Sequence, residues 1–186
     1  MLEWARPENK NINEHLKFCG VHLLDSFFLE PKDVGNVQAF VKSCEPLGIH
    51  TAFTYWVLAK YFNNTCFILE KNSQIIGWIA GVTSSSHEST LYIWQIGVAP
   101  EHRGKKYSEN LIDAIVFVAR NNGCKSIHFS ISPQNIPCLK AFERYARLNK
   151  ISMKGLDKVE IVDSSNNVED VEILYQFKLT PPFLPE

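Results

Sequence analysis

The sequence predicts an α/β (α+β) fold, in which a mixed, largely antiparallel central sheet is flanked by helices. Two observations predict it. Runs rich in β-formers and joined by short polar turns come first along the chain, and helices then alternate with strands. A chain of 186 residues, of which 45% are hydrophobic, can also bury one sizeable core, so we expect one folded domain.

The first elements follow a polar N-terminal extension over residues 1–24. Residues 25–31, DSFFLEP, are a short β-type run closed by a proline, and we expect the folded domain to begin there. Asp33 is a suitable N-cap for an amphipathic helix. Residues 53–62 favour a second helix, although a strand is also compatible with their aromatic-rich sequence. The apolar residues of the first helix are Val34, Val37, Phe40 and Val41.

Three consecutive strands are expected in the middle of the chain. Residues 66–82, CFILEKNSQIIGWIAGV, contain two β-rich runs joined by the polar turn Lys71–Gln74, which is the sequence form of a hairpin. Residues 89–99, STLYIWQIGVA, continue as a third strand after a polar loop. Short polar turns between consecutive strands imply an antiparallel meander.

Helices and strands alternate in the second half of the chain. A helix is expected from Ser108 to about residue 121. A strand (KSIHFSISP), a helix (PCLKAFERYARLN) and a last strand (VEILYQFKL) follow. We expect the domain to span residues 25–180, with residues 181–186 as a C-terminal tail. The apolar face of the first of these helices consists of Leu111, Ile112, Ile115 and Val118.

Charge and hydropathy argue against several classes of partner. With 19 Lys and Arg against 20 Asp and Glu, the formal net charge is −1, so no overall basic field exists to hold nucleic acid. The longest apolar runs are far shorter than the roughly 20 residues that a membrane helix needs, and we expect no membrane partner. The N-terminus has no apolar run followed by a small-residue cleavage site, so a cytoplasmic location is the default.

The cysteines are expected to be reduced and mostly buried thiols. They form no CxxC pair and have no histidine partner at zinc spacing, so we expect no metal site. The five are Cys19, Cys44, Cys66, Cys124 and Cys138.

The stretch WQIGVAPEHRGKKYSENL, residues 94–111, predicts an anion site. Pro100 cannot donate to a sheet ladder, so the strand ends near residue 99 and the chain turns before the next helix. The free backbone N–H groups and positive dipole end of that helix attract an anion, and a pyrophosphate fits there. The turn matches neither a nucleoside-triphosphate loop nor a dinucleotide motif. A solvated basic turn is the alternative reading. The side chains that would add positive charge to this anion site are those of Arg103, Lys105 and Lys106.

This order of strand, basic turn and helix, with Asn135 at the turn of a second strand–helix pair, resembles the GNAT family of acyl-CoA N-acyltransferases. In that family the turn binds the pyrophosphate of coenzyme A through main-chain N–H groups, which implies acetyl-CoA as co-substrate here. Lys106 and Ser108 stand where the family prefers glycine and glycine or alanine. The matching run is Arg103, Gly104, Lys105, Lys106, Tyr107 and Ser108.

Across about residues 25–178 the chain is similar to the L-2,4-diaminobutyrate acetyltransferases of ectoine biosynthesis. The segments that carry this similarity are CEPLGIHTAFTYWVLAKYF, TCFILEKNSQIIGWIAG, TLYIWQIGVAPEHRG, SISPQNIPCLKAFERYAR and VEILYQF. The resemblance implies a primary amine of a small molecule, such as a diamino acid, as acceptor. In the substrate segment Tyr55 is kept, whereas Gly48, His50, Thr51 and Phe53 replace the family's Asp, Asn, Ser and Tyr.

The resemblance also implies roles for residues around the acyl group. Backbone groups of Ile96, Gly97 and Val98 are expected to hold the thioester and pantetheine, with Gly97 suited either to a local bulge or to close packing. Phe142 stands where the family often has a tyrosine acid, and Tyr145, one helical turn further on, is a substitute proton donor or a structural tyrosine. Cys138 lies near the cofactor's end and is a packed thiol rather than a nucleophile.

On the acceptor side, Trp94 offers a flat wall that attracts cations, and Tyr55 lies in the same substrate segment as His50. Glu172 matches the last carboxylate of the family's acidic motif and is the main candidate to bind the ammonium or draw its proton, although a solvated strand-start Glu is the alternative. His50 is a second candidate base. A binding module without turnover, or an acetyltransferase for an antibiotic-like or peptide amine, are the competing functions. A homodimer is also expected, because the related enzymes commonly pair.

Overall fold

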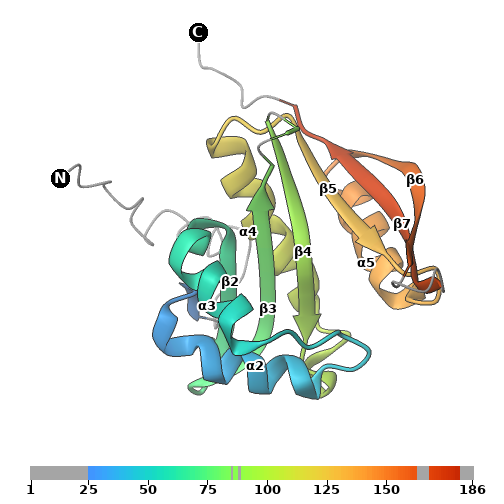
Figure 1. Ribbon diagram of the computed structural model, residues 1–186. Coiled ribbons are helices and arrows are strands. Elements are labelled where there is room, and N and C mark those ends of the chain that lie inside the picture. Colours follow the sequence, from blue (N-terminus) through green and yellow to red (C-terminus); the bar gives the residue numbers. More distant parts are fainter. Residues whose placement is uncertain (1–24, 85, 88, 163–167, 181–186) are drawn as a thin grey trace, which may run out of the picture.

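The computed structural model describes residues 25–84, 86–87, 89–162 and 168–180. The expected N-terminal extension and C-terminal tail lie outside the described residues. Seven strands form one sheet in the order β1-β2-β3-β4-β5-β7-β6 (Figure 1). The strands are β1 (Asp25–Phe28), β2 (Cys66–Lys71), β3 (Gln74–Thr83), β4 (Thr90–Val98), β5 (Ser126–Ile131), β6 (Ser152–Val162) and β7 (Val168–Lys178).

Only the pairing of β4 with β5 is parallel, and the other five neighbouring pairs in the described sheet are antiparallel. The expected meander is β2-β3-β4. Its first turn has Asn72 and Ser73 in the left-handed region, at φ 52° and 58°, which is the geometry of a tight type I′ hairpin. The mixed, largely antiparallel sheet predicted from the sequence is therefore confirmed.

Helices cover both faces of the central strands (Figure 1). They are α2 (Val34–Ser43), α3 (Ala52–Tyr61), α4 (Tyr107–Asn121) and α5 (Ile136–Leu148), with short 3₁₀ turns at Pro31–Asp33, Asn63–Thr65 and Pro100–His102. Strand β3 is apolar on both sides because Trp78 packs under α2 and α3, whereas Ile79 joins the core under α4 and α5. Two apolar clusters thus sandwich the sheet.

The two N-terminal helices are where the sequence predicted them. Residues 52–61 form a helix rather than a strand, and the Thr51 hydroxyl accepts a hydrogen bond from the Thr54 N–H at its start. Asp33 does precede α2, but its carboxylate accepts from the Glu30 N–H at 2.9 Å instead of capping that helix. Among the described residues, no helix is long and apolar enough to cross a membrane.

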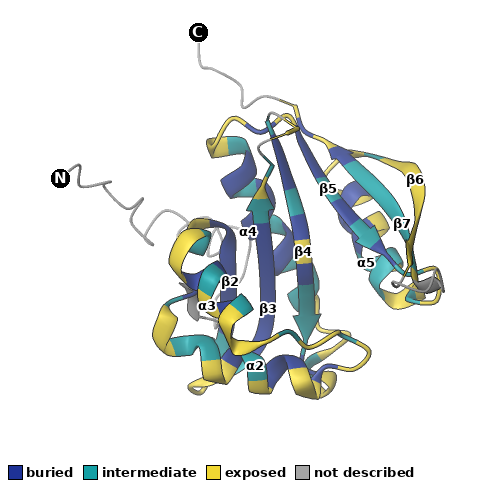
Figure 2. Cartoon of the chain, in the orientation of Figure 1, coloured by how far each residue is buried: buried dark blue, intermediate teal, exposed yellow. Residues whose placement is uncertain are grey.

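Strand β6 was not predicted. It pairs with β7 alone, at the edge of the sheet, and its residues are nearly all exposed (Figure 2). A strand that buries neither face has no need for alternating apolar residues, so its sequence, SMKGLDKVEIV, lacks the signal that identified the other strands.

Candidate active site

A bulge in β4 opens the sheet. Ala80 of β3 pairs with Gln95 and Gly81 pairs with Ile93, so Trp94 is the extra residue. The parallel pairing with β5 ends at the same place, with Ile93 opposite Phe129. Beyond the bulge β4 and β5 diverge toward their C-terminal ends (Figure 1), so the backbone of residues 94–98 is not paired with β5.

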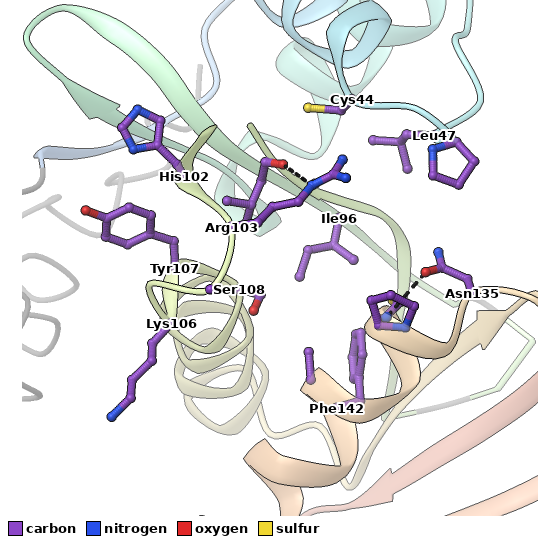
Figure 3. Close-up of a pocket in the computed structure, with 17 residues that line it drawn as sticks. Cys44, Leu47, Ile96, His102, Arg103, Lys106, Tyr107, Ser108, Asn135 and Phe142 are labelled. Atoms are coloured by element: carbon purple, nitrogen blue, oxygen red, sulfur yellow. Dashed lines mark hydrogen bonds between the residues drawn. The ribbon is translucent and has the colours of Figure 1, made fainter. Parts of the chain in front are cut away.

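A pocket lies at this divergence, between the end of β4, the turn that follows it, and the first turns of α4 and α5 (Figure 3). Almost the whole set of residues predicted to bind the cofactor lines it. These residues are Ile96, Gly97, Val98, Arg103, Gly104, Lys106, Tyr107, Ser108, Asn135 and Phe142. Lys105 is not part of the lining, and its ammonium donates to the Glu101 carbonyl at 3.2 Å.

The turn before α4 presents unused hydrogen-bond donors. Gly104 and Lys106 have φ of 76° and 66°, and this left-handed backbone turns successive N–H groups the same way. Across the described part of the chain, the amides of residues 104–108 donate to no other group. Because the positive end of the α4 dipole lies behind them, these amides form an anion site.

Arg103 has a different part in this turn. Its Nε donates to the Val98 carbonyl at 3.2 Å, and its Nη2 donates to the Glu45 carbonyl at 3.0 Å. The guanidinium therefore ties the turn to β4, by a bond drawn in Figure 3, and to the chain after α2. Its charge still reinforces the anion site, but the backbone amides are the free donors.

Gly97 is a packed glycine and not the bulge. It pairs in register with Trp78, and a Cβ at this position would lie 2.9 Å from Leu47 Cδ2. The glycine thus lets the chain after α2 close on β4. Six lining residues that sequence reasoning missed are Cys44, Pro46, Leu47, His102, Pro137 and Ala141. Only the CEPLG similarity pointed to the first three, since this irregular segment has no periodicity.

The N-terminus of α5 forms the opposite wall. The Asn135 side chain caps the helix by accepting from the Cys138 N–H at 3.3 Å, and Phe142 stacks on Phe129 with ring centroids 4.1 Å apart. Burial, together with the charge of Glu172, raises the pKa of the Cys138 thiol to about 11. The thiol is thus protonated near neutral pH, which agrees with a packed role.

Tyr145 is not brought to the pocket. It is 3% exposed, and its hydroxyl donates to the Asp113 carboxylate of α4 at 2.7 Å. It packs in the core beside Phe177. Its hydroxyl therefore joins two helices, and Tyr145 is not among the residues that line the pocket.

On the acceptor side, Trp94 is 39% exposed at the bulge, and the His50 ring lies against it with centroids 5.0 Å apart. Tyr55 is fully buried, so it supports the site from behind. Its hydroxyl accepts from the His50 N–H at 3.3 Å and donates to Gln95 Oε1 at 3.4 Å. Phe53 points away from this network, exposed and stacked on Trp56.

Glu172 lies on β7, the strand next to β5, and is not itself among the residues that line the pocket. Burial raises the pKa of its carboxyl, a hydrogen bond from the Ser130 hydroxyl opposes this, and Asp170 adds to the rise. Its charge also acts on Cys138, which lines the pocket, so the carboxylate lies within electrostatic reach of the pocket wall. The Ser130 hydroxyl is 2.9 Å from that of Tyr92, a pair that sequence reasoning missed.

Within the described residues, no group of three or more His, Cys, Asp or Glu is arranged to hold a metal ion. The four described cysteines, Cys44, Cys66, Cys124 and Cys138, are free.

A bulged, diverging strand followed by a turn of free amides at a helix N-terminus is an arrangement for holding a phosphorylated acyl carrier. Residues 36–146 match the family model for the acetyltransferase (GNAT) family, and the chain belongs to this family. This confirms the family resemblance seen in the sequence.

Two curated relatives of the chain carry the same name. The chain is 27% identical over 117 residues to an L-2,4-diaminobutyric acid acetyltransferase of Halomonas elongata, covering 62% of this chain and 61% of the relative. It is 23% identical over 154 residues to one of Vibrio parahaemolyticus, covering 82% and 85%. The similarity thus spans about 60% of the length of the first curated relatives that the chain matches.

Solved structures agree on the fold. A diaminobutyrate acetyltransferase from Paenibacillus lautus, in complex with L-2,4-diaminobutyric acid and coenzyme A, has a TM-score of 0.73 at 22% identity, covering 88% of this chain and 97% of that one. The ribosomal-protein-S18-alanine N-acetyltransferase of Escherichia coli has a TM-score of 0.67 at 9% identity, covering 88% and 100%. These likenesses confirm the predicted fold class.

Proposed function

We propose that this protein transfers an acetyl group from acetyl-CoA to a primary amine of a small molecule. The observation that carries this proposal is the set of free amides at residues 104–108, in a turn that lines the same pocket as the end of β4, where β4 is no longer paired with β5. The diaminobutyrate acetyltransferase names of its relatives support a diamino acid as one acceptor.

The residues present fit acetyl-CoA. The amides of residues 104–108 would hold its pyrophosphate, with Lys106 adding positive charge. Ile96 and Val98 belong to the part of β4 that is not paired with β5, where backbone groups on the open side can hold the pantetheine arm and the thioester carbonyl. When bound, the thioester supplies an activated acetyl group for attack by an amine.

The acceptor must lose its ammonium proton before it can attack. In our proposal Glu172 accepts this proton, and the Ser130 hydroxyl keeps the carboxylate oriented. Trp94, half exposed at the bulge, offers a ring face to the ammonium. The base and the aromatic wall thus come from opposite sides of the gap between β4 and β5.

A panel assay tests the proposal. The purified chain would be incubated with acetyl-CoA and single amines, namely diamines, diamino acids, polyamines and aminoglycosides, while thiol release is followed. We expect release above the hydrolysis rate with at least one amine. Binding of acetyl-CoA in calorimetry without release for any amine would instead indicate a binding module, and failure to bind it would overturn the proposal.

A further inference from the structure

Gln95 lies next to the bulged Trp94, and only 7% of it is exposed. Its amide joins three parts of the molecule. Trp78 Nε1–H of β3 donates to Oε1 at 2.9 Å, and the Tyr55 hydroxyl of α3 donates to the same oxygen at 3.4 Å. Its Nε2 donates to the Gly48 carbonyl at 2.7 Å. A buried amide with all these partners is held in one place.

The partners also fix which way the amide faces. The indole N–H of Trp78 can only donate, and the Gly48 carbonyl can only accept. If the oxygen and nitrogen of Gln95 were exchanged, its N–H would face the Trp78 N–H, and its oxygen would face the Gly48 carbonyl oxygen. Both contacts would be unfavourable. The bond to Gly48 depends on Nε2 alone.

This bond holds the middle of residues 44–51, which connect α2 to α3. On one side of Gly48, Pro46 and Leu47 line the pocket. On the other side, His50 lies against Trp94. The connection thus borders both the proposed acetyl-CoA pocket and the proposed amine site.

The ends of the connection have their own tethers. Arg103 donates to the Glu45 carbonyl, and Gln38 Nε2 of α2 donates to the His50 carbonyl at 3.0 Å. The Gln95 bond is the tether between them, and it comes from the residue that follows the bulge.

We propose that Gln95 is a positioning residue that holds residues 44–51 against the β4 bulge and so sets the geometry of the amine site. The proposal rests on the proposed acetyltransferase function for its consequence on the acceptor. Its structural part, the tether itself, can be tested without any substrate.

Hydrogen exchange of the full chain, read in peptides covering residues 44–51, tests the tether. Gln95→Met keeps the side-chain length and removes every hydrogen bond, and we expect protection in these peptides to fall about tenfold. Gln176→Met is the control, because the side chain of Gln176 on β7 is hydrogen-bonded to His128 on β5 and has no bond to residues 44–51 among the described contacts. Unchanged protection in Gln95→Met, with a native circular dichroism spectrum, would overturn the proposal.

In Gln95→Glu the protection of residues 44–51 should depend on pH, which a simple loss of packing would not cause. The ionised carboxylate of this variant would oppose the Gly48 carbonyl, whereas its protonated form can again donate to the Gly48 carbonyl and accept from Trp78, as Gln95 does. Burial raises the pKa of such a carboxyl, so we expect protection of residues 44–51, corrected for intrinsic exchange, to return as the pH falls. The titratable groups around the position are His50, Tyr55 and Cys44, and their own effects would appear equally in Gln95→Met. No return at low pH would contradict the proposal even if Gln95→Met does not fold.

Kinetics test the consequence. With the best amine from the panel, Gln95→Met should raise KM for the amine about tenfold while the calorimetric Kd for acetyl-CoA stays within about twofold. An equal rise in the KM for the amine and in the Kd for acetyl-CoA would contradict a role in the amine site. If the wild-type chain acetylates no amine, the proposed function fails, and the exchange experiments still decide whether Gln95 tethers residues 44–51.

Discussion

The hydroxyl of Tyr145 on α5, a buried residue, donates to the partly exposed carboxylate of Asp113 on α4 across 2.7 Å. This hydrogen bond joins the two helices that carry the proposed anion site and the opposite pocket wall. Tyr145, which the sequence suggested as a proton donor, therefore makes a contact between two helices in the structure.

Tyr145→Phe separates the two roles of this tyrosine. The contact predicts a loss of about 1 kcal/mol in the free energy of unfolding, because Asp113 loses a partly buried, charge-assisted hydrogen bond. Urea unfolding followed by fluorescence measures this loss. A large fall in kcat with stability unchanged would instead support the role of proton donor that the sequence suggested.

Gly104→Val should weaken acetyl-CoA binding. A β-branched residue is strained at φ 76°, and its side chain would keep phosphate from approaching the amides of residues 104–108. We expect the calorimetric Kd for acetyl-CoA to rise at least about tenfold, because one or more charge-assisted hydrogen bonds to phosphate would be lost.

Gly123→Val is the matched control for this change. Gly123 has φ 72°, has open space around its Cβ position as Gly104 does, and lies beyond the other end of α4. Both variants should lose similar stability, but only Gly104→Val should lose affinity. Equal affinities in the two variants would place the cofactor elsewhere.

Much of the fold was predictable because most strands bury at least one face. The apolar runs around Ile68, Ile79 and Leu91 lie in the core. The polar residues Asn72 and Ser73 predict the hairpin from local sequence, and both have the left-handed backbone that its turn requires. Edge strand β6 was not predictable, because nearly all of its residues are exposed and it buries neither face. Its partner is the backbone of β7, and backbone pairing places almost no demand on side chains.

The site was predictable where it is built from backbone and only partly where it is built from side chains. The turn at residues 103–108 follows from Pro100, Gly104 and the helix after them. The bulge at Trp94 does not follow from the sequence, because register depends on how β3 and β4 pair. The tether from Gln95 to Gly48 joins residues 47 positions apart, and no local pattern reports such a contact.

Glu172→Gln should lower kcat/KM about 100-fold for any accepted amine, the usual size of a general-base contribution. In the wild type, activity needs the ionised carboxylate, so kcat/KM should fall as the pH falls through the pKa of Glu172, which burial raises above its ordinary value. Ser130→Ala removes a bond that favours the ionised form, so the acidic limb of the pH profile should move to higher pH.

Ser126→Ala is the control for this shift, because Ser126 forms a comparable hydroxyl pair with Thr90 at 2.9 Å on the same two strands. It should leave the acidic limb in place. An acidic limb that persists unchanged in Glu172→Gln would assign the proton to another group, of which His50 is the nearest candidate.

We predict a homodimer. Several large apolar side chains are exposed on and before α3, among them Ile49, Phe53 and Tyr61 at 51%, 70% and 68%. Burial of such side chains between two subunits is favourable. Light scattering at micromolar concentration should give about twice the chain mass of 21.3 kDa, and a single-chain mass would contradict the prediction.

The last prediction concerns the acceptor. The family's substrate segment has Asp where this chain has Gly48, and the carbonyl of Gly48 is already bonded to Gln95. A buried diamino acid needs partners for its α-ammonium and α-carboxylate, and one charged partner is missing. We therefore expect 2,4-diaminobutyrate to be a poor or slow substrate, with a larger or differently charged amine preferred.

Gly48→Asp should reverse this preference in part. A Cβ at position 48 meets nothing within 4 Å, so a side chain can begin there without a clash, and kcat/KM for diaminobutyrate should rise about tenfold relative to the preferred amine. Gly35→Asp, which adds the same charge on α2 where a Cβ also has open space, should leave the ratio unchanged. The measurement is the ratio of kcat/KM for diaminobutyrate to that for each amine in the panel. If the wild-type ratio already favours diaminobutyrate over all of them, the altered specificity is wrong, because Trp94 and Glu172 would then suffice to hold the diamino acid without an aspartate at position 48.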